Sequence, residues 1–219
     1  MTIGFILLIA TGLLILFGVG QRVLDRLRLT DRQAILFIAL IIGGGLLPEI
    51  WLSESFAFNV GGALIPLILC IYLWAKADTF LERARSAVAA LLTGVAVFVL
   101  GRVLPADPSE MVVDPSLAYG AAGGIIAYVL GRSRRGAFIA GTVGVMLANL
   151  AAWGYANAMG ANQKLMLGGA GGFDVIVLAG LLSVLLSELM GELIERARRG
   201  RQKPTREFVN GDFVRREQR

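Results

Sequence analysis

Asp174 is the residue whose type and position are best suited to chemistry. It lies near the start of the apolar run in LMLGGAGGFDVIVLAGLLSVLLSELMGELIERARRG, residues 165–200. If a membrane helix begins near Leu165, the carboxylate lies about 13 Å inside a hydrocarbon core about 30 Å thick, where an ionisable group marks a functional site or an ion pair. Alternatively, GGAGG is a loop, the helix begins at Phe173, and Asp174 caps its N-terminus. The sequence leaves both interpretations open.

Three other polar residues within apolar runs could complete a pocket with Asp174: Glu49, Asn59 and Asn149. The glycines before Asp174, Gly171 and Gly172 among them, could break the helix and leave backbone amides lining a cavity. Such a site could bind or conduct a small solute, a cation or a proton. More often, polar residues of this kind form hydrogen bonds between helices, each worth about 0.6–2 kcal/mol.

The composition excludes several kinds of site. The chain has no histidine, so Ser-His and Cys-His nucleophiles and histidine-ligated metal sites are excluded. The single cysteine, Cys70, lies in an apolar run and has no second cysteine for an intramolecular disulfide. We expect no cofactor and no metal site.

The hydrophobicity of the chain indicates an integral membrane protein. Of its 219 residues, 56% are apolar, against about 45–50% in soluble chains, and the mean hydropathy is +0.71. The net charge of +5 could suggest nucleic acid binding. The basic residues, however, lie between apolar segments, as membrane topology requires, so nucleic acid is not an expected partner.

Runs of about 17–25 apolar residues predict an all-α bundle of seven transmembrane helices over residues 1–194. The N-terminal MTIG has no basic region, so we interpret the first run as a true span, not a signal peptide. The predicted spans are 2–20, 34–52, 56–73, 87–104, 116–130, 137–158 and 166–193.

The distribution of basic residues predicts the orientation of this bundle. Nineteen of the 21 Lys and Arg residues follow spans one, three, five and seven, whereas Arg102 and Lys164 lie on the other side. Short cytoplasmic loops carry the excess of Lys and Arg. We therefore expect an outer N-terminus, a cytoplasmic C-terminus and a location in the inner, or cell, membrane.

The remaining residues, 195–219, form a basic tail. Within EFVNGDFV, Asn210-Gly211 stands between short apolar pairs, which is a hairpin signal. An isolated hairpin is marginal in water, so a disordered tail held near anionic lipid headgroups is the alternative. Besides the bilayer, the tail could meet a membrane-protein partner or a second copy of the chain.

Small residues recur at three- and four-residue spacing in the last three spans. On a helix this spacing produces one face of small side chains, which lets helices approach closely in lipid. We therefore expect spans five to seven to form one tight sub-bundle. The residues on these faces include Gly120, Gly124, Gly141, Gly144, Gly180, Ser183, Ser187 and Gly191.

Four motifs in order resemble those of a poorly characterised family of prokaryotic multi-pass membrane proteins of unknown function: NVGGALIP, GRVLP, AGTVG and GGAGGFD. The resemblance extends from Asn59 to Leu186 and implies a bacterial membrane protein, with no established activity to transfer. In that family a second acidic residue follows the GT-x-G stretch, where this chain has Asn149 or Leu150.

Three functions are compatible with these features. The first is a non-enzymatic intramembrane site near Asp174 for a solute, cation or proton. The second is a scaffold or assembly subunit that docks through its helices and basic tail. The third is an intramembrane aspartyl protease, which needs two carboxyls that share a proton. Only Glu49 could partner Asp174, and it is expected near the interface.

Overall fold

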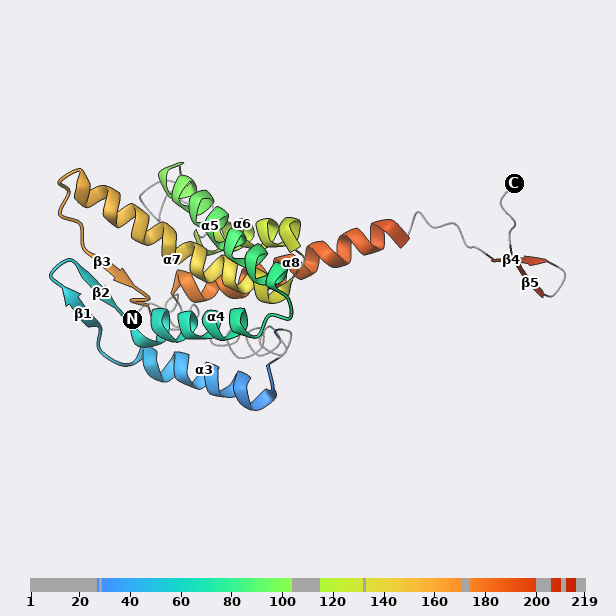
Figure 1. The fold of residues 1–219 in the computed structure, drawn as a ribbon, viewed down its shortest axis with the longest axis horizontal. Coiled ribbons are helices and arrows are strands. Elements are labelled where there is room, and N and C mark those ends of the chain that lie inside the picture. Colours follow the sequence, from blue (N-terminus) through green and yellow to red (C-terminus); the bar gives the residue numbers. More distant parts are fainter. Residues whose placement is uncertain are drawn as a thin grey trace, which may run out of the picture.

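The computed structural model describes residues 27, 29–103, 115–131, 133–170, 174–199, 206–209 and 212–215. These residues are mostly helical (Figure 1). The longest helices are α5 (Phe80–Val103), α7 (Arg134–Ala158) and α8 (Val175–Arg199). All of α5 and α7, and α8 over Val175–Arg196, are long and apolar enough to cross a membrane. This indicates a membrane protein.

Shorter apolar helices occupy other predicted spans. Helix α6 (Pro115–Gly131) lies where a span over 116–130 is predicted. Helix α5 begins seven residues before its predicted start at residue 87. Seven spanning helices are not seen among the described residues, and the first predicted span, 2–20, lies outside them.

The predicted helix over 34–52 is wrong at its far end. Helix α3 (Asp31–Gly45) is 15 residues long, and strand β1 (Ile50–Ser53) follows it. Pro48 disfavours helical backbone in the residue before it and has no backbone N–H to donate. The summed hydropathy of residues 34–52 does not show that the helix ends before Pro48, because most residues on both sides are apolar.

The predicted helix over 56–73 is wrong at its beginning. Strand β2 (Phe56–Phe58) comes first, then the π-helical turn η2 (Val60–Leu64), and only then α4 (Ile65–Ala75). The helix predicted over 166–193 likewise begins too early. Strand β3 (Leu165–Leu167) and a turn precede α8.

The three strands form one sheet in the order β1-β2-β3. Strands β1 and β2 pair antiparallel, with an irregularity between Trp51 and Ser53, whereas β2 and β3 pair parallel, Ala57 opposite Met166. The sheet lies at one end of the helices (Figure 1). It joins two segments of the chain that are more than a hundred residues apart.

Small residues lie where α6, α7 and α8 meet. The Ser183 hydroxyl of α8 lies 3.0 Å from the carbonyl oxygen of Gly120 in α6 and 2.7 Å from that of Ala179. A Cβ on Gly124 would come within 2.8 Å of the Ser183 carbonyl oxygen. Gly144 faces a different neighbour, because its Cβ would meet Thr93 of α5. Gly123, which the sequence interpretation did not include, lies against Gly141.

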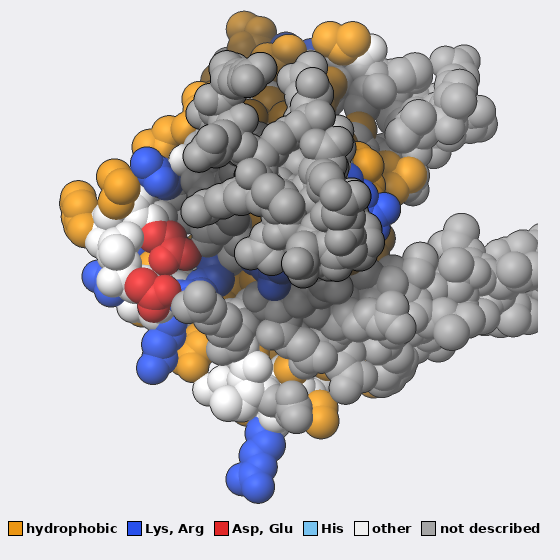
Figure 2. All heavy atoms as spheres, turned by 90° about the vertical axis from the view of Figure 1, so that its right-hand side faces the viewer, with side chains coloured by type: hydrophobic (Ala, Val, Ile, Leu, Met, Phe, Trp, Pro, Cys, Tyr) orange, Lys and Arg blue, Asp and Glu red, His pale blue; other side chains and the backbone are white. Residues whose placement is uncertain are grey.

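The two ends of the helices differ in chemistry. The basic end comprises the C-terminal end of α4 and the N-terminal ends of α5 and α7, and the guanidinium of Arg135 donates there to the Lys76 carbonyl oxygen. Figure 2 looks onto the side that lies at the right of Figure 1, with Lys and Arg side chains in blue and acidic ones in red. At the sheet end, the Arg102 guanidinium lies 4.1 Å from the centre of the Tyr155 ring.

Side-chain caps fix the starts of the helices at the basic end. The hydroxyls of Thr30, Thr79 and Ser133 each accept the backbone N–H of the residue three positions later. These donors are Gln33, Glu82 and Gly136. Each cap satisfies an amide that has no partner within the helix. These caps fix the residue at which each helix begins.

The C-terminal residues form a separate hairpin. Strands β4 (Arg206–Val209) and β5 (Asp212–Arg215) pair antiparallel, with Val209 opposite Asp212. The two strands make a sheet of their own. Of the two sequence interpretations of the tail, the structure has the hairpin.

Candidate functional site

Asp174 lies at the N-terminal end of α8, not inside a helix. Its Oδ1 accepts the backbone N–H of Ile176 at 2.9 Å, and its Oδ2 accepts the N–H of Ala170 at 3.4 Å. Its backbone carbonyl oxygen accepts the N–H of Leu178, which is the first backbone hydrogen bond of helix α8. The structure thus has the capping arrangement that the sequence allowed, with the preceding turn folded back over the carboxylate.

The carboxylate of Asp174 lies in a half-buried position at this turn. Burial raises the pKa of the Asp174 carboxyl above its ordinary value, because it removes water from the charged form. The amide donors of Ile176 and Ala170 oppose this effect, since they stabilise the carboxylate. Desolvation is the larger of the two influences. The folded environment therefore disfavours the charged form of this carboxyl relative to water.

Asn59 caps the π-helical turn η2 and is almost fully buried, with 3% of its surface exposed. Its Oδ1 accepts the N–H groups of Gly61 and Gly62 at 2.9 and 3.0 Å. Its Nδ2 donates to the Leu47 carbonyl oxygen at 3.2 Å, and its backbone N–H donates to that of Leu167. Asn59 therefore holds three chain segments together, with its side-chain groups already engaged.

Glycine backbones join the two turns. A Cβ on Gly62 would overlap the carbonyl group of Gly168, and a Cβ on Gly168 would overlap the backbone of Gly62. Gly168 also has a φ of 73°, in the left-handed region that glycine adopts freely. On its other side, η2 touches the end of α3, where Gly61 packs against the backbone of Gly45. Only hydrogen-sized side chains fit this junction.

The structure brings part of the predicted site together. The turn of Asn59 lies directly beside the segment that leads to Asp174. Glu49 is exposed and Asn149 is half-buried in the middle of α7, and within the described residues neither forms a hydrogen bond with Asp174. Gly171 and Gly172 lie outside the described residues. The sequence interpretation places a break in the helix at the glycines before Asp174, but it does not predict the contact between Gly62 and Gly168.

The described residues contain no cluster of three or more Cys, Asp or Glu side chains that could hold a metal ion. The hydrogen bonds of the Asp174 carboxylate are those donated by the backbone amides of Ala170 and Ile176.

One family comparison matches the chain. The profile of DUF1614, a protein family of unknown function, matches residues 16–186. No curated protein and no solved structure matches it significantly. The family match covers the turns of Asn59 and Asp174 and the first part of α8, up to residue 186.

Proposed function

The chain belongs to DUF1614, a family of proteins of unknown function, and we propose that it is a multi-pass membrane protein that binds a proton at Asp174. The proposal includes seven spans, an outer N-terminus and a cytoplasmic C-terminus in the inner membrane. Within this topology, the Asp174 turn lies toward the outer surface.

The placement of the charges supports this orientation. Lys76, Arg134 and Arg135 lie at the basic end, where α4 ends and α5 and α7 begin. At the sheet end, the two basic side chains among the described residues lie over aromatic rings: Arg102 over Phe98 and Tyr155, and Lys164 over Trp51. Cytoplasmic loops carry the excess of Lys and Arg, and aromatic side chains gather at membrane interfaces.

One observation carries the proposed function. The half-buried carboxylate of Asp174 lies at the start of a membrane-length helix, beside a junction where three chain segments meet. Among the solute, cation and proton that the sequence suggested, the proton fits best. A solute requires a cavity and a cation requires several oxygen ligands, whereas a proton requires one carboxylate whose charged form is disfavoured.

A comparison of unfolding temperatures in detergent tests this function. Wild type and Asp174→Asn are measured across pH and across a panel of monovalent and divalent cations. Asn keeps the Oδ1 acceptor for Ile176 but cannot titrate. The proposal expects a pH response that wild type has and the variant lacks, with no cation response. A cation response that only wild type shows would assign the site to that ion instead.

The hairpin of the tail favours a second function, a scaffold or assembly subunit. Strands β4 and β5 form an isolated two-stranded sheet, which is marginal in water unless another strand or surface completes it. A chain ending at Gly200 tests this function. Loss of one stoichiometric partner from the purified complex would support the scaffold. An unchanged complex, or no complex with either chain, would contradict it.

The aspartyl protease remains a third hypothesis with less support. Its chemistry requires a second carboxyl that shares a proton with Asp174. In the described part of the chain, the hydrogen bonds of Asp174 go to the amides of Ala170 and Ile176.

A further inference from the structure

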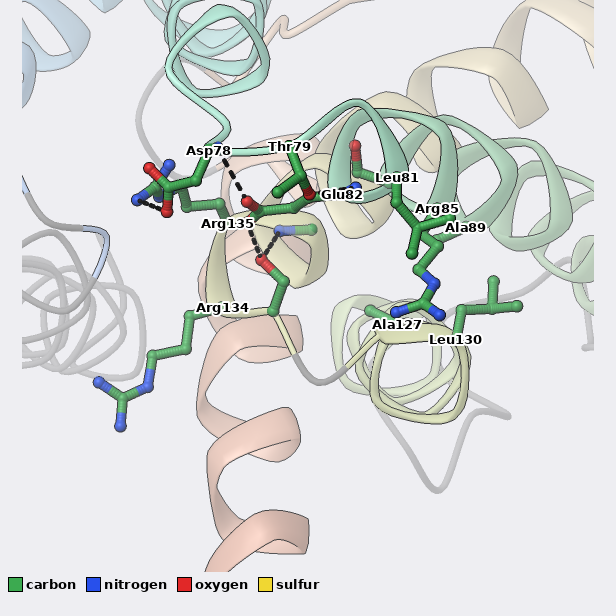
Figure 3. A pocket seen from close by; sticks show the side chains of 13 residues that line it. Asp78, Thr79, Leu81, Glu82, Arg85, Ala89, Ala127, Leu130, Arg134 and Arg135 are labelled. Atoms are coloured by element: carbon green, nitrogen blue, oxygen red, sulfur yellow. Dashed lines mark hydrogen bonds and ion pairs between the residues drawn. The ribbon is translucent and has the colours of Figure 1, made fainter.

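A cavity of about 420 Å³ opens at the basic end (Figure 3). The N-terminal ends of α5 and α7, which contribute to it, lie at the opposite end of the helices from the sheet (Figure 1). The cavity lies between these N-terminal ends and the C-terminal end of α6. One part of its wall is charged and another part is apolar. The apolar part consists of Leu81 and Ala89 from α5 and of Ala127 and Leu130 from α6.

Most charged groups of the wall already have partners. The guanidinium of Arg135 lies 3.5 Å from the carboxylate of Asp78. The Glu82 carboxylate accepts a hydrogen bond from the Ser133 hydroxyl at 2.7 Å and another from the backbone N–H of Asp78 at 3.1 Å. Arg134, at the rim, lies 3.2 Å from Glu188 of α8. These contacts, drawn in part in Figure 3, engage both acidic side chains of the lining.

Arg85 is the exception among these groups. Its side chain extends toward Ala127 and Leu130, on the side of the cavity away from Asp78 and Arg135 (Figure 3). No carboxylate of the described residues pairs with it. The cavity therefore presents an unpaired guanidinium directly against an apolar wall.

We propose that this cavity binds the phosphodiester head group of an anionic phospholipid. The guanidinium fork of Arg85 matches the oxygens of a phosphate, which is a preferred partner of arginine. Leu81, which is exposed, and Leu130, which is half-buried, offer apolar contact to the glycerol backbone and the first carbons of the acyl chains. Basic pockets between membrane helices bind lipid head groups in this way.

The apolar wall favours a lipid over a soluble phosphate ester. A soluble ester would leave Leu81, which is 57% exposed, uncovered. The carboxylates of Asp78 and Glu82 limit how many negative charges the cavity accepts. A phosphodiester carries one negative charge, so it suits a wall in which one guanidinium is left without a partner. The inference presupposes that the chain lies in a bilayer, but it is independent of proton binding at Asp174.

Lipid binding to the full chain in detergent tests the inference. Native mass spectrometry and thermal unfolding are followed during titration with phosphatidylglycerol, phosphatidylcholine or glycerol 3-phosphate. The variants are Arg85→Gln and, as a matched control, Arg32→Gln. Arg32 is an exposed arginine on α3 that does not line the cavity. Both variants remove one positive charge.

The expected result is that phosphatidylglycerol binds wild type and Arg32→Gln alike, and Arg85→Gln about fivefold more weakly. Phosphatidylcholine should bind all three chains weakly, and glycerol 3-phosphate should not protect any of them. Equal binding to Arg85→Gln and Arg32→Gln would overturn the site. Protection by glycerol 3-phosphate that depends on Arg85 would overturn the lipid and assign a soluble phosphate ester. Because Arg85 is exposed, its replacement is not expected to prevent folding.

Discussion

The backbone of Gly62 packs directly against the backbone of Gly168, so neither residue has room for a Cβ atom. This contact connects the turn that Asn59 caps with the segment that leads to Asp174. It lies beside the parallel pairing of β2 and β3. The position of Asp174 therefore depends on two glycines that are far apart in the sequence.

Replacement of these glycines should destabilise the protein. Gly62→Ala introduces a Cβ into backbone atoms, and overpacking of this kind costs about 1–3 kcal/mol. Gly168→Ala should cost about 1–2 kcal/mol more, because its φ of 73° is strained for alanine. Chemical unfolding in detergent measures both. The control is Gly43→Ala, at a position where a Cβ would meet no atom within 4 Å. Equal stability of all three variants would refute the contact.

The packing of α7 against α8 gives a second prediction. A Cβ on Gly141 would come within 2.6 Å of the Ala179 carbonyl oxygen and overlap the Ser183 hydroxyl, so Gly141→Ala should cost about 1–3 kcal/mol. Gly154→Ala, on the same helix but with no atom within 4 Å, should be neutral or stabilise by up to about 1 kcal/mol. The unfolding temperature should fall in Gly141→Ala and stay equal or rise in Gly154→Ala. A shift of the same size and sign in both would contradict this packing.

Asn59→Ala should lower stability through unpaired polar groups. The variant leaves the buried N–H groups of Gly61 and Gly62 and the carbonyl oxygen of Leu47 without their partner. Each unpaired buried group costs about 1–3 kcal/mol. Asn59→Asp keeps the acceptor for Gly61 and Gly62 but places a buried carboxylate oxygen against the Leu47 carbonyl oxygen. It should therefore protect the two glycine amides better than Asn59→Ala while still lowering stability. Amide hydrogen exchange at the two glycines measures the effect, and unchanged protection in Asn59→Ala would exclude this role.

The stability should depend on pH through Asp174. Its pKa is raised in the folded state, so the folded chain binds this proton more tightly than the unfolded chain does. The contribution is fully present below the ordinary value of 3.8 and is lost as the pH rises through the folded pKa. The unfolding temperature of wild type minus that of Asp174→Asn should therefore fall with rising pH. A difference that is constant, or that grows with pH, would exclude proton uptake here.

The orientation of the chain can be tested with its single cysteine. Cys70 is buried, with 2% of its surface exposed, so wild type should not react with a membrane-impermeant maleimide in intact cells. Lys164→Cys should be labelled from outside, and Arg196→Cys only after the membrane is permeabilised, because both positions are exposed at opposite ends. The reverse pattern would invert the proposed topology.

Local patterns in the sequence predicted the helical part of this molecule better than its junction. The small-residue spacing of α6 and α8 is a local period, and those residues lie at their contacts. By contrast, Phe56-Ala57-Phe58 reads equally well as part of an apolar helix or as a buried strand. Only its partner decides, and that partner, Leu165–Leu167, is too distant in the chain for any local pattern to show it.

The candidate sites illustrate the same limit. Asp174 and Asn59 could be selected by type, because polar residues in apolar runs are rare, and the glycines before Asp174 allowed the cap. The cavity at Arg85 was not predicted, since arginines after a span are sufficiently explained by topology. Which of these arginines has a carboxylate partner, as Arg135 has Asp78, and which has none, as Arg85, depends on how the ends of three helices meet.

An infrared titration of the Asp174 carboxyl tests the central claim most directly. The C=O band of a protonated carboxyl is recorded in wild type and in Asp174→Asn as the pH is raised. The account predicts a band present only in wild type that persists above pH 3.8, the ordinary value for aspartate. Identical spectra for the two chains, or a wild-type band that disappears at or below that pH, would contradict the claim that this residue binds a proton.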